Sequence, residues 1–104
     1  MKRLSFLSLT IGASILAGIL IYLVGGTPDG EAIFKREGCI GCHSFKGRGG
    51  GAGPELTGVT ERRSDSWIKK HIKDPKIHDP ESRMPPFEHL SGKEIAALVR
   101  YLKD

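Results

Sequence analysis

Two cysteines and a histidine stand together in the segment Cys39-Ile40-Gly41-Cys42-His43. This spacing lets the two thiols reach the two vinyl groups of a single haem and form thioether bonds with them. The next residue, His43, then lies beside the iron, which its ring nitrogen can bind as an axial ligand. The motif therefore predicts one haem c, covalently attached through Cys39 and Cys42, with His43 on the iron.

Three other chemistries also use a pair of cysteines at this spacing. A thioredoxin-like redox pair belongs to a βαβ context, of which the sequence shows no sign. A zinc site needs two further ligands from elsewhere, and the chain has no second pair of cysteines. A structural disulfide would leave His43 without a role. Covalent haem is the preferred interpretation, with these three as open alternatives.

The second axial position of the iron decides what the haem can do. Met84 is the only methionine in residues 27–104, and it is followed by Pro85-Pro86. The prolines restrict the backbone and lower the entropy cost of holding one sulfur over the iron. The rival ligands are the other histidines: His71, His78 and His89. A vacant position is the remaining possibility. We expect the metal ligands to be His43 and Met84.

An apolar run precedes all of these residues. Lys2 and Arg3 come before residues 4–24, an uncharged stretch of 21 residues, of which 15 are apolar. As a helix it would be about 32 Å long at ~1.5 Å per residue, enough to cross a hydrocarbon core of about 30 Å. The basic flank predicts that the rest of the chain lies outside the cytoplasm. We expect residues 1–26 to be an uncleaved membrane anchor. The alternative is an export signal, cleaved at Val24-Gly25-Gly26, which leaves a soluble periplasmic protein.

Residues 27–104 have room for one small domain, which excludes a multi-domain enzyme. Apolar residues make up only 38% of the whole chain, so the core is thin and needs a cofactor or another cross-link. The domain holds 14 of the 16 basic side chains against all 12 acidic ones, a net charge of +2. Because it has neither a basic block nor an aromatic stacking platform, we expect no nucleic-acid partner.

Helix signals surround the chemistry. A first helix is expected over residues 28–37, capped by Thr27, and a second from about Ser64 to just before Pro75. A last helix begins after Ser91, which forms a capping box with Glu94. Four prolines make residues 74–90 an irregular loop, and no strand pattern of any length appears. The predicted fold class is all-α, with three to four short helices around one haem and an N-terminal transmembrane helix.

In the order of these features the chain resembles the class I monohaem cytochromes c over nearly all of residues 28–104. The residues that carry the resemblance are Gly30 and Phe34, the motif from Cys39 to His43, Gly53-Pro54-x-Leu56, Trp67, Met84-Pro85-Pro86, and finally Leu98 and Tyr101. The chain departs from the long mitochondrial type, because the segment between Trp67 and Met84 is compact and has no obvious tyrosine near the methionine.

The resemblance implies roles for individual residues. The carbonyl of Pro54 should accept a hydrogen bond from the ring N–H of His43, Leu56 should pack on the porphyrin, and Trp67 should donate its indole N–H to a haem propionate. Gly30 and Phe34 should cross the last helix near Leu98 and Tyr101. The expected cofactor-binding residues are Cys39, Cys42, His43, Pro54, Leu56, Trp67 and Met84, and no catalytic residue is expected.

The function that follows is one-electron transfer rather than enzymatic catalysis. With both axial positions filled, the iron has no site for a small-molecule substrate. We expect a membrane-tethered carrier on the periplasmic side, with membrane respiratory complexes as electron donor and acceptor. The alternatives are a permanent haem-bearing subunit of such a complex and, less favoured, a haem peroxidase or gas-binding protein with a labile distal site.

Overall fold

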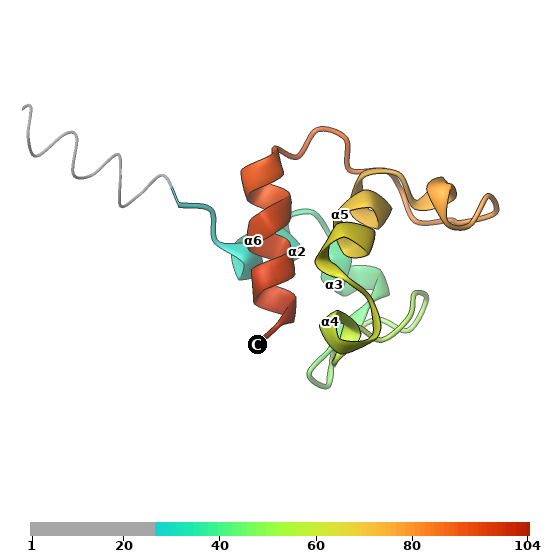
Figure 1. Ribbon diagram of the computed structural model, residues 1–104. Coiled ribbons are helices and arrows are strands. Elements are labelled where there is room, and N and C mark those ends of the chain that lie inside the picture. The colour runs from blue at the N-terminus through green and yellow to red at the C-terminus, as the bar shows by residue number, and fades with distance from the viewer. Residues whose placement is uncertain (1–26) are drawn as a thin grey trace, which may run out of the picture.

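Five short α-helices, one 3₁₀ turn and a small hairpin make up the part of the chain that the computed structural model describes, residues 27–104 (Figure 1). The elements are, in order, α2 (Gly30–Arg36), α3 (Cys39–Cys42), β1 (Ser44–Phe45), β2 (Arg48–Gly49), α4 (Val59–Arg62), α5 (Asp65–Lys73), η1 (Pro75–Ile77) and α6 (Gly92–Leu102). The expected membrane segment, residues 1–26, lies outside the described residues. Within residues 27–104, no helix has the length and apolar character to span a bilayer.

The all-α prediction is confirmed in outline, but the described residues contain five α-helices instead of three to four, and the small elements α3, α4, η1 and the hairpin were missed. α3 and α4 have four residues each, too short to show a helical period in the sequence. β1 and β2 pair antiparallel across the two-residue turn Lys46-Gly47. Both turn residues have positive φ, 53° and 79°, as a type I′ hairpin turn requires. Strands of two residues are too short to show an alternating pattern. The sequence, in which no strand pattern appears, therefore did not predict this hairpin.

The first helix begins two residues later than predicted, because Asp29 caps it rather than Thr27. The Asp29 carboxylate accepts hydrogen bonds from the backbone N–H groups of Glu31 at 3.0 Å and Ala32 at 3.4 Å. A negatively charged carboxylate at this position also interacts favourably with the helix dipole. The neutral hydroxyl of a threonine gains less from that dipole.

The starts of the other two long helices are confirmed. The Ser64 hydroxyl accepts from the backbone N–H of Trp67 at 3.1 Å and caps α5. At α6, the Ser91 hydroxyl accepts from the N–H of Glu94, and the Glu94 carboxylate accepts from the N–H of Ser91. This reciprocal pair is the predicted capping box.

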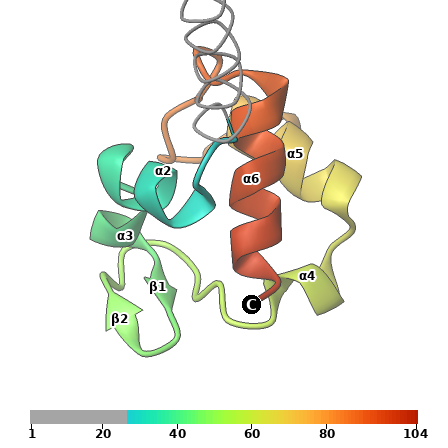
Figure 2. The ribbon, with the colours of Figure 1, turned by 90° about the vertical axis from the view of Figure 1, so that its left-hand side faces the viewer.

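α6 is the central element, with α2 on one side and α5 on the other (Figure 2). Gly30 is buried where α2 crosses α6, against the backbone of Ala97. Phe34 lies next to Tyr101, with ring centroids 5.5 Å apart, and Phe45 of the hairpin packs on the same tyrosine at 5.1 Å. The buried core consists of Ile33, Phe34, Phe45, Ile68, Phe87, Leu90, Ile95, Ala97, Leu98, Val99 and Leu102.

A hydrogen bond ties the end of α2 to the loop that carries Met84, which runs over residues 78–91 between η1 and α6, and an ion pair ties it to α6. Glu37 accepts a hydrogen bond from the ring of His89 at 3.0 Å, and Arg36 reaches Glu94 at 2.9 Å. The hydrogen bond from His89 is the main cause that holds the pKa of Glu37 below its usual value. The chain just before Cys39 is therefore fixed to the far end of the Met84 loop.

Candidate functional site

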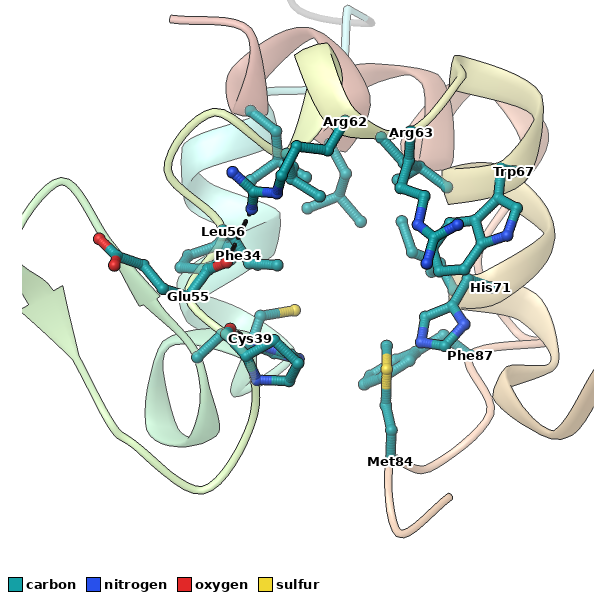
Figure 3. A pocket seen from close by; sticks show the side chains of 17 residues that line it. Phe34, Cys39, Glu55, Leu56, Arg62, Arg63, Trp67, His71, Met84 and Phe87 are labelled. Carbon is teal, nitrogen blue, oxygen red and sulfur yellow. Dashed lines mark hydrogen bonds between the residues drawn. The ribbon is translucent and has the colours of Figure 1, made fainter. Parts of the chain in front are cut away.

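Two adjoining cavities, of about 270 Å³ and about 550 Å³, open between the attachment motif and the wall formed by α5 and the Met84 loop. They share one boundary, because both are lined by Cys39, His43, Pro54, His71, Met84 and Phe87. Figure 3 shows Cys39 and Leu56 on one side of this space and Trp67, His71 and Met84 on the other.

The sulfur-bearing wall is the single turn of α3. Gly38 precedes it with a left-handed φ of 78°, and the extended His43 ends it by donating its backbone N–H to the Cys39 carbonyl at 2.9 Å. Cys39 and Cys42 are both free thiols, so the structure contains no disulfide between them. Cys39 is half-buried, and burial is the main cause that raises the pKa of its thiol. Cys42 is exposed at the edge of the larger cavity.

The imidazole of His43 is held in one orientation from two sides. Its Nδ1 lies 2.7 Å from the carbonyl oxygen of Pro54. A carbonyl only accepts, so Nδ1 carries the proton and Nε2 keeps its lone pair. Gly53 lies directly against the ring, where a Cβ on it would come within 2.6 Å of Cε1. The N–H of Gly53 donates to the Cys42 carbonyl at 2.7 Å, which fixes this glycine in place.

Adding one methyl group at Gly53 therefore tests how tightly His43 is held. Gly53→Ala forces either the imidazole or the backbone at Pro54 to move, which weakens the 2.7 Å hydrogen bond. We expect a loss of about 1–3 kcal/mol in the free energy of unfolding, the usual cost of overpacking. Denaturant unfolding measures it. Gly51→Ala is the matched control in the same loop, because a Cβ there meets nothing within 4 Å. Equal unfolding midpoints in the two variants would contradict this account of the His43 wall.

The opposite wall carries Met84 on a loop tied to α5. The backbone N–H of Phe87 donates to the Ile72 carbonyl at 3.0 Å, and the N–H of Met84 donates to the Ser82 hydroxyl at 3.3 Å. Met84 is half-buried and packs against the core. Its thioether stands across the cavity from Cys39 (Figure 3).

An aromatic stack forms the rim beside Met84. The rings of His71 and His78 lie nearly parallel to the indole of Trp67, with centroids 4.7 Å and 4.1 Å from it. The Nδ1 atoms of the two histidines are 3.1 Å apart. The Arg63 guanidinium lies 4.3 Å from the centroid of the indole ring. Burial is the main cause that lowers the pKa of His71.

Sequence reasoning missed the two arginines beside the site, Arg62 and Arg63, and it named His78 only as a possible iron ligand. Arg63 lies between α4 and α5, so it belongs to no recognisable helical pattern. Arg62 donates to the carbonyls of Thr57 at 2.8 Å and Glu55 at 3.2 Å, and so fastens the loop that follows Pro54. Only tertiary structure brings these side chains together.

The structure brings all seven expected site residues to these two adjoining cavities. Six of them line the smaller cavity, namely Cys39, His43, Pro54, Leu56, Trp67 and Met84, and Cys42 lines the larger cavity. Of the rival ligands, His71 lines both cavities, whereas His78 and His89 line neither. The individual roles of these residues towards a cofactor stay predictions.

The residues present suit a covalently attached iron porphyrin. Two free thiols lie at one edge, an imidazole with a free Nε2 lies beside them, and a thioether stands opposite. Apolar side chains fill most of the remaining lining, including Phe34, Leu56 and Val59. In the described part of the chain, no three or more His, Cys, Asp or Glu side chains are grouped to hold a bare metal ion, as the zinc alternative would need.

Residues 28–104 match the family model of cytochrome c. The chain is 37% identical over 84 residues to a cytochrome c-553-like protein of Synechocystis sp., which covers 81% of this chain and 73% of that protein. It is 32% identical over 83 residues to cytochrome c oxidase subunit 2 of Alkalihalophilus pseudofirmus, covering 72% of this chain and 24% of that oxidase protein.

A third relative is a subunit of the nitric oxide reductase of Stutzerimonas stutzeri. It is 29% identical over 79 residues, which cover 71% of this chain and 54% of that relative. The match therefore spans about a quarter of the oxidase relative and about half of the reductase relative.

Proposed function

This chain belongs to the cytochrome c family, and we propose that it is a membrane-tethered one-electron carrier whose iron is bound by His43 and Met84. It is a class I monohaem cytochrome c, and its cofactor is one haem c attached at the Cys39/Cys42 pair. Its general activity is haem-based electron transfer. The bound haem supplies an iron that gains and loses a single electron.

The observation that carries the proposed ligation is the placement of a nitrogen and a sulfur on facing walls of one cavity. His43 presents the lone pair of Nε2, because Pro54 occupies the Nδ1–H. Met84 lines the same cavity from the Met84 loop. With both positions taken, the chain leaves no open coordination site for a small molecule, so simple electron transfer is the chemistry that remains.

The chain tunes the reduction potential through the ligand and through burial. A neutral thioether favours the ferrous state more than a second imidazole does. The apolar lining, with Leu56 and Phe34, disfavours the additional charge of the ferric state, which also raises the reduction potential. Cys42 is exposed, so the edge of the cofactor attached there lies near the surface, where electrons can enter and leave.

Replacing Met84 tests the ligation directly. Met84→Ala should lower the reduction potential by a sizeable part of the roughly 0.8 V that axial ligands span in haem proteins. The measurement is a spectroelectrochemical titration of the purified holoprotein. Ile77→Ala is the control from the same stretch of chain, because Ile77 is 60% exposed and lines neither cavity. A potential and a spectrum that stay the same in Met84→Ala would remove Met84 from the proposal.

For the chain as a whole, we propose residues 1–26 as the anchor and residues 27–104 as the haem domain on the periplasmic side. The apolar run at residues 4–24 supports the anchor. Membrane respiratory complexes are the proposed electron donor and acceptor. Two relatives support this by name, since one belongs to a cytochrome c oxidase and the other to a nitric oxide reductase.

The same two names also favour a second candidate, a permanent subunit of a respiratory complex. Extraction of native membranes in mild detergent, followed by size-exclusion chromatography with detection of the haem, separates the two candidates. A mobile carrier elutes as a small species, whereas a permanent subunit elutes together with a large complex. The intact mass of the extracted protein also shows whether residues 1–26 are retained.

A further inference from the structure

We infer that His71 is a reserve iron ligand on the same wall as Met84, and that its imidazole binds the iron whenever the thioether leaves. This inference rests on the proposed ligation by Met84 and goes beyond it, because it assigns a second, alternative ligand to the same position. Its consequence is that the iron stays six-coordinate, at a lower potential, instead of opening to small molecules.

The first argument is location. Besides His43, His71 is the only histidine of residues 27–104 that lines either cavity, and it lines both, as Met84 does. Figure 3 shows His71 and Met84 on the same side of the cavity, opposite Cys39. A group that replaces the Met84 sulfur has to come from this wall, because His43 approaches from the attachment motif on the other one.

The second argument is orientation. The Nδ1 of His71 lies 3.1 Å from the Nδ1 of His78, a residue that lines neither cavity. When His71 donates this hydrogen bond, its Nε2 keeps the lone pair and is the nitrogen left for the cavity. The same arrangement holds His43, whose Nδ1 donates to Pro54. A histidine whose other nitrogen is engaged in this way is typical of metal ligands.

The third argument is that the main contacts that hold His71 do not involve Met84. His71 stacks on Trp67 at 4.7 Å with an interplanar angle of 10°. Its helix, α5, is held by the buried Ile68 and by the ion pair of Asp65 with Lys103 at 2.8 Å. Met84 instead belongs to the loop before Phe87, which is outside α5. Loss of the Met84 sulfur from the iron therefore leaves these contacts of His71 and α5 intact.

Replacement of Met84 by His71 as the iron ligand needs no further reactant. The iron–sulfur bond to Met84 breaks, and a bond from the iron to Nε2 of His71 forms. No electron is transferred, and the proton on Nδ1 remains in the hydrogen bond to His78.

The test uses the full-length holoprotein in three forms: wild type, Met84→Ala, and Met84→Ala with His71→Phe. Phenylalanine keeps a ring that can stack on Trp67 and removes the nitrogen. We expect Met84→Ala to give a ferric low-spin spectrum with two nitrogen ligands by electron paramagnetic resonance, and the double variant to be high-spin. Met84→Ala with His89→Phe is the matched control, because His89 lines neither cavity, and it should stay low-spin.

Two results would overturn the inference: a high-spin Met84→Ala protein, or a double variant that keeps two nitrogen ligands. Should the double variant fail to mature, added imidazole gives the same answer with Met84→Ala alone. If the iron of Met84→Ala readily binds added imidazole, its position is open and the inference is overturned. If the iron does not bind added imidazole, His71 already fills that position and the inference is supported. The two proposals remain distinguishable, because a spectrum shared by wild type and Met84→Ala counts against Met84, whereas a changed but high-spin spectrum counts only against His71.

Discussion

Gly30→Ala is expected to cost about 3 kcal/mol or more in the free energy of unfolding, at the upper end of what overpacking causes. The added Cβ would lie 2.1 Å from the carbonyl oxygen of Ala97 and 2.7 Å from the Cβ of Tyr101. One of these is backbone and the other is the rigid root of a side chain, so no rotamer change relieves the contact. α2 and α6 have to move apart, and the packing of Phe34 on Tyr101 at 5.5 Å is lost with them.

A domain of this size has a total stability of roughly 4–12 kcal/mol at ~0.05–0.15 kcal/mol per residue. The substitution therefore removes a large part of it. Denaturant unfolding followed by circular dichroism gives the difference. Gly92→Ala is the matched control, because Gly92 begins α6 and a Cβ there meets nothing within 4 Å. That control should stay within about 1 kcal/mol of wild type or be slightly more stable. Two variants that unfold at the same denaturant concentration would refute the close crossing.

Removing the haem is the second change with a large expected effect. With Cys39→Ser and Cys42→Ser together, both thioether bonds are lost, and we expect the haem-free domain to be largely unfolded. The smaller cavity alone measures about 270 Å³. At ~24 cal/mol per Å³ of cavity, leaving it empty costs about 6 kcal/mol, which is comparable with the whole stability of such a domain. The core around it is thin and has no other cross-link in the described residues.

Thermal unfolding of the haem-free double variant, followed by circular dichroism, is the measurement. The expected curve has no cooperative transition. The single variant Cys42→Ser is the control, because it retains the half-buried Cys39 as an attachment point and should keep its haem and a cooperative transition. A sharp transition in the haem-free double variant would show that the polypeptide folds without its cofactor.

Local signals explain which parts of the fold were predictable. The attachment motif, Ser64 and the Ser91–Glu94 capping box act over one helical turn, so the sequence contains the complete signal. The choice of Asp29 over Thr27 as a cap was not predictable in the same way. Both residue types cap helices, and the difference is set by where the chain enters the packing of α2 on α6.

Tertiary packing explains the rest of the site. The resemblance placed the Pro54 carbonyl beside the ring of His43, but nothing in the sequence indicates that Gly53 itself lies against that ring, ten residues away. The pairing of His71 with His78 depends on η1, which turns the chain back after Pro75. Phe45 joins the aromatic cluster on α6 only because of a hairpin too short to predict. Long-range contacts of this kind leave no periodic pattern in the sequence.

The proton NMR spectrum of the ferrous protein, with its methionine methyl groups labelled with ¹³C, tests the ligation by His43 and Met84 most directly. The chain has two methionines, Met1 and Met84. A methyl group held above the iron experiences the ring current of the porphyrin, so the account predicts one methionine signal far upfield of the other. That signal should disappear in Met84→Leu. Two methionine methyl signals at ordinary positions in the ferrous wild type would contradict the account.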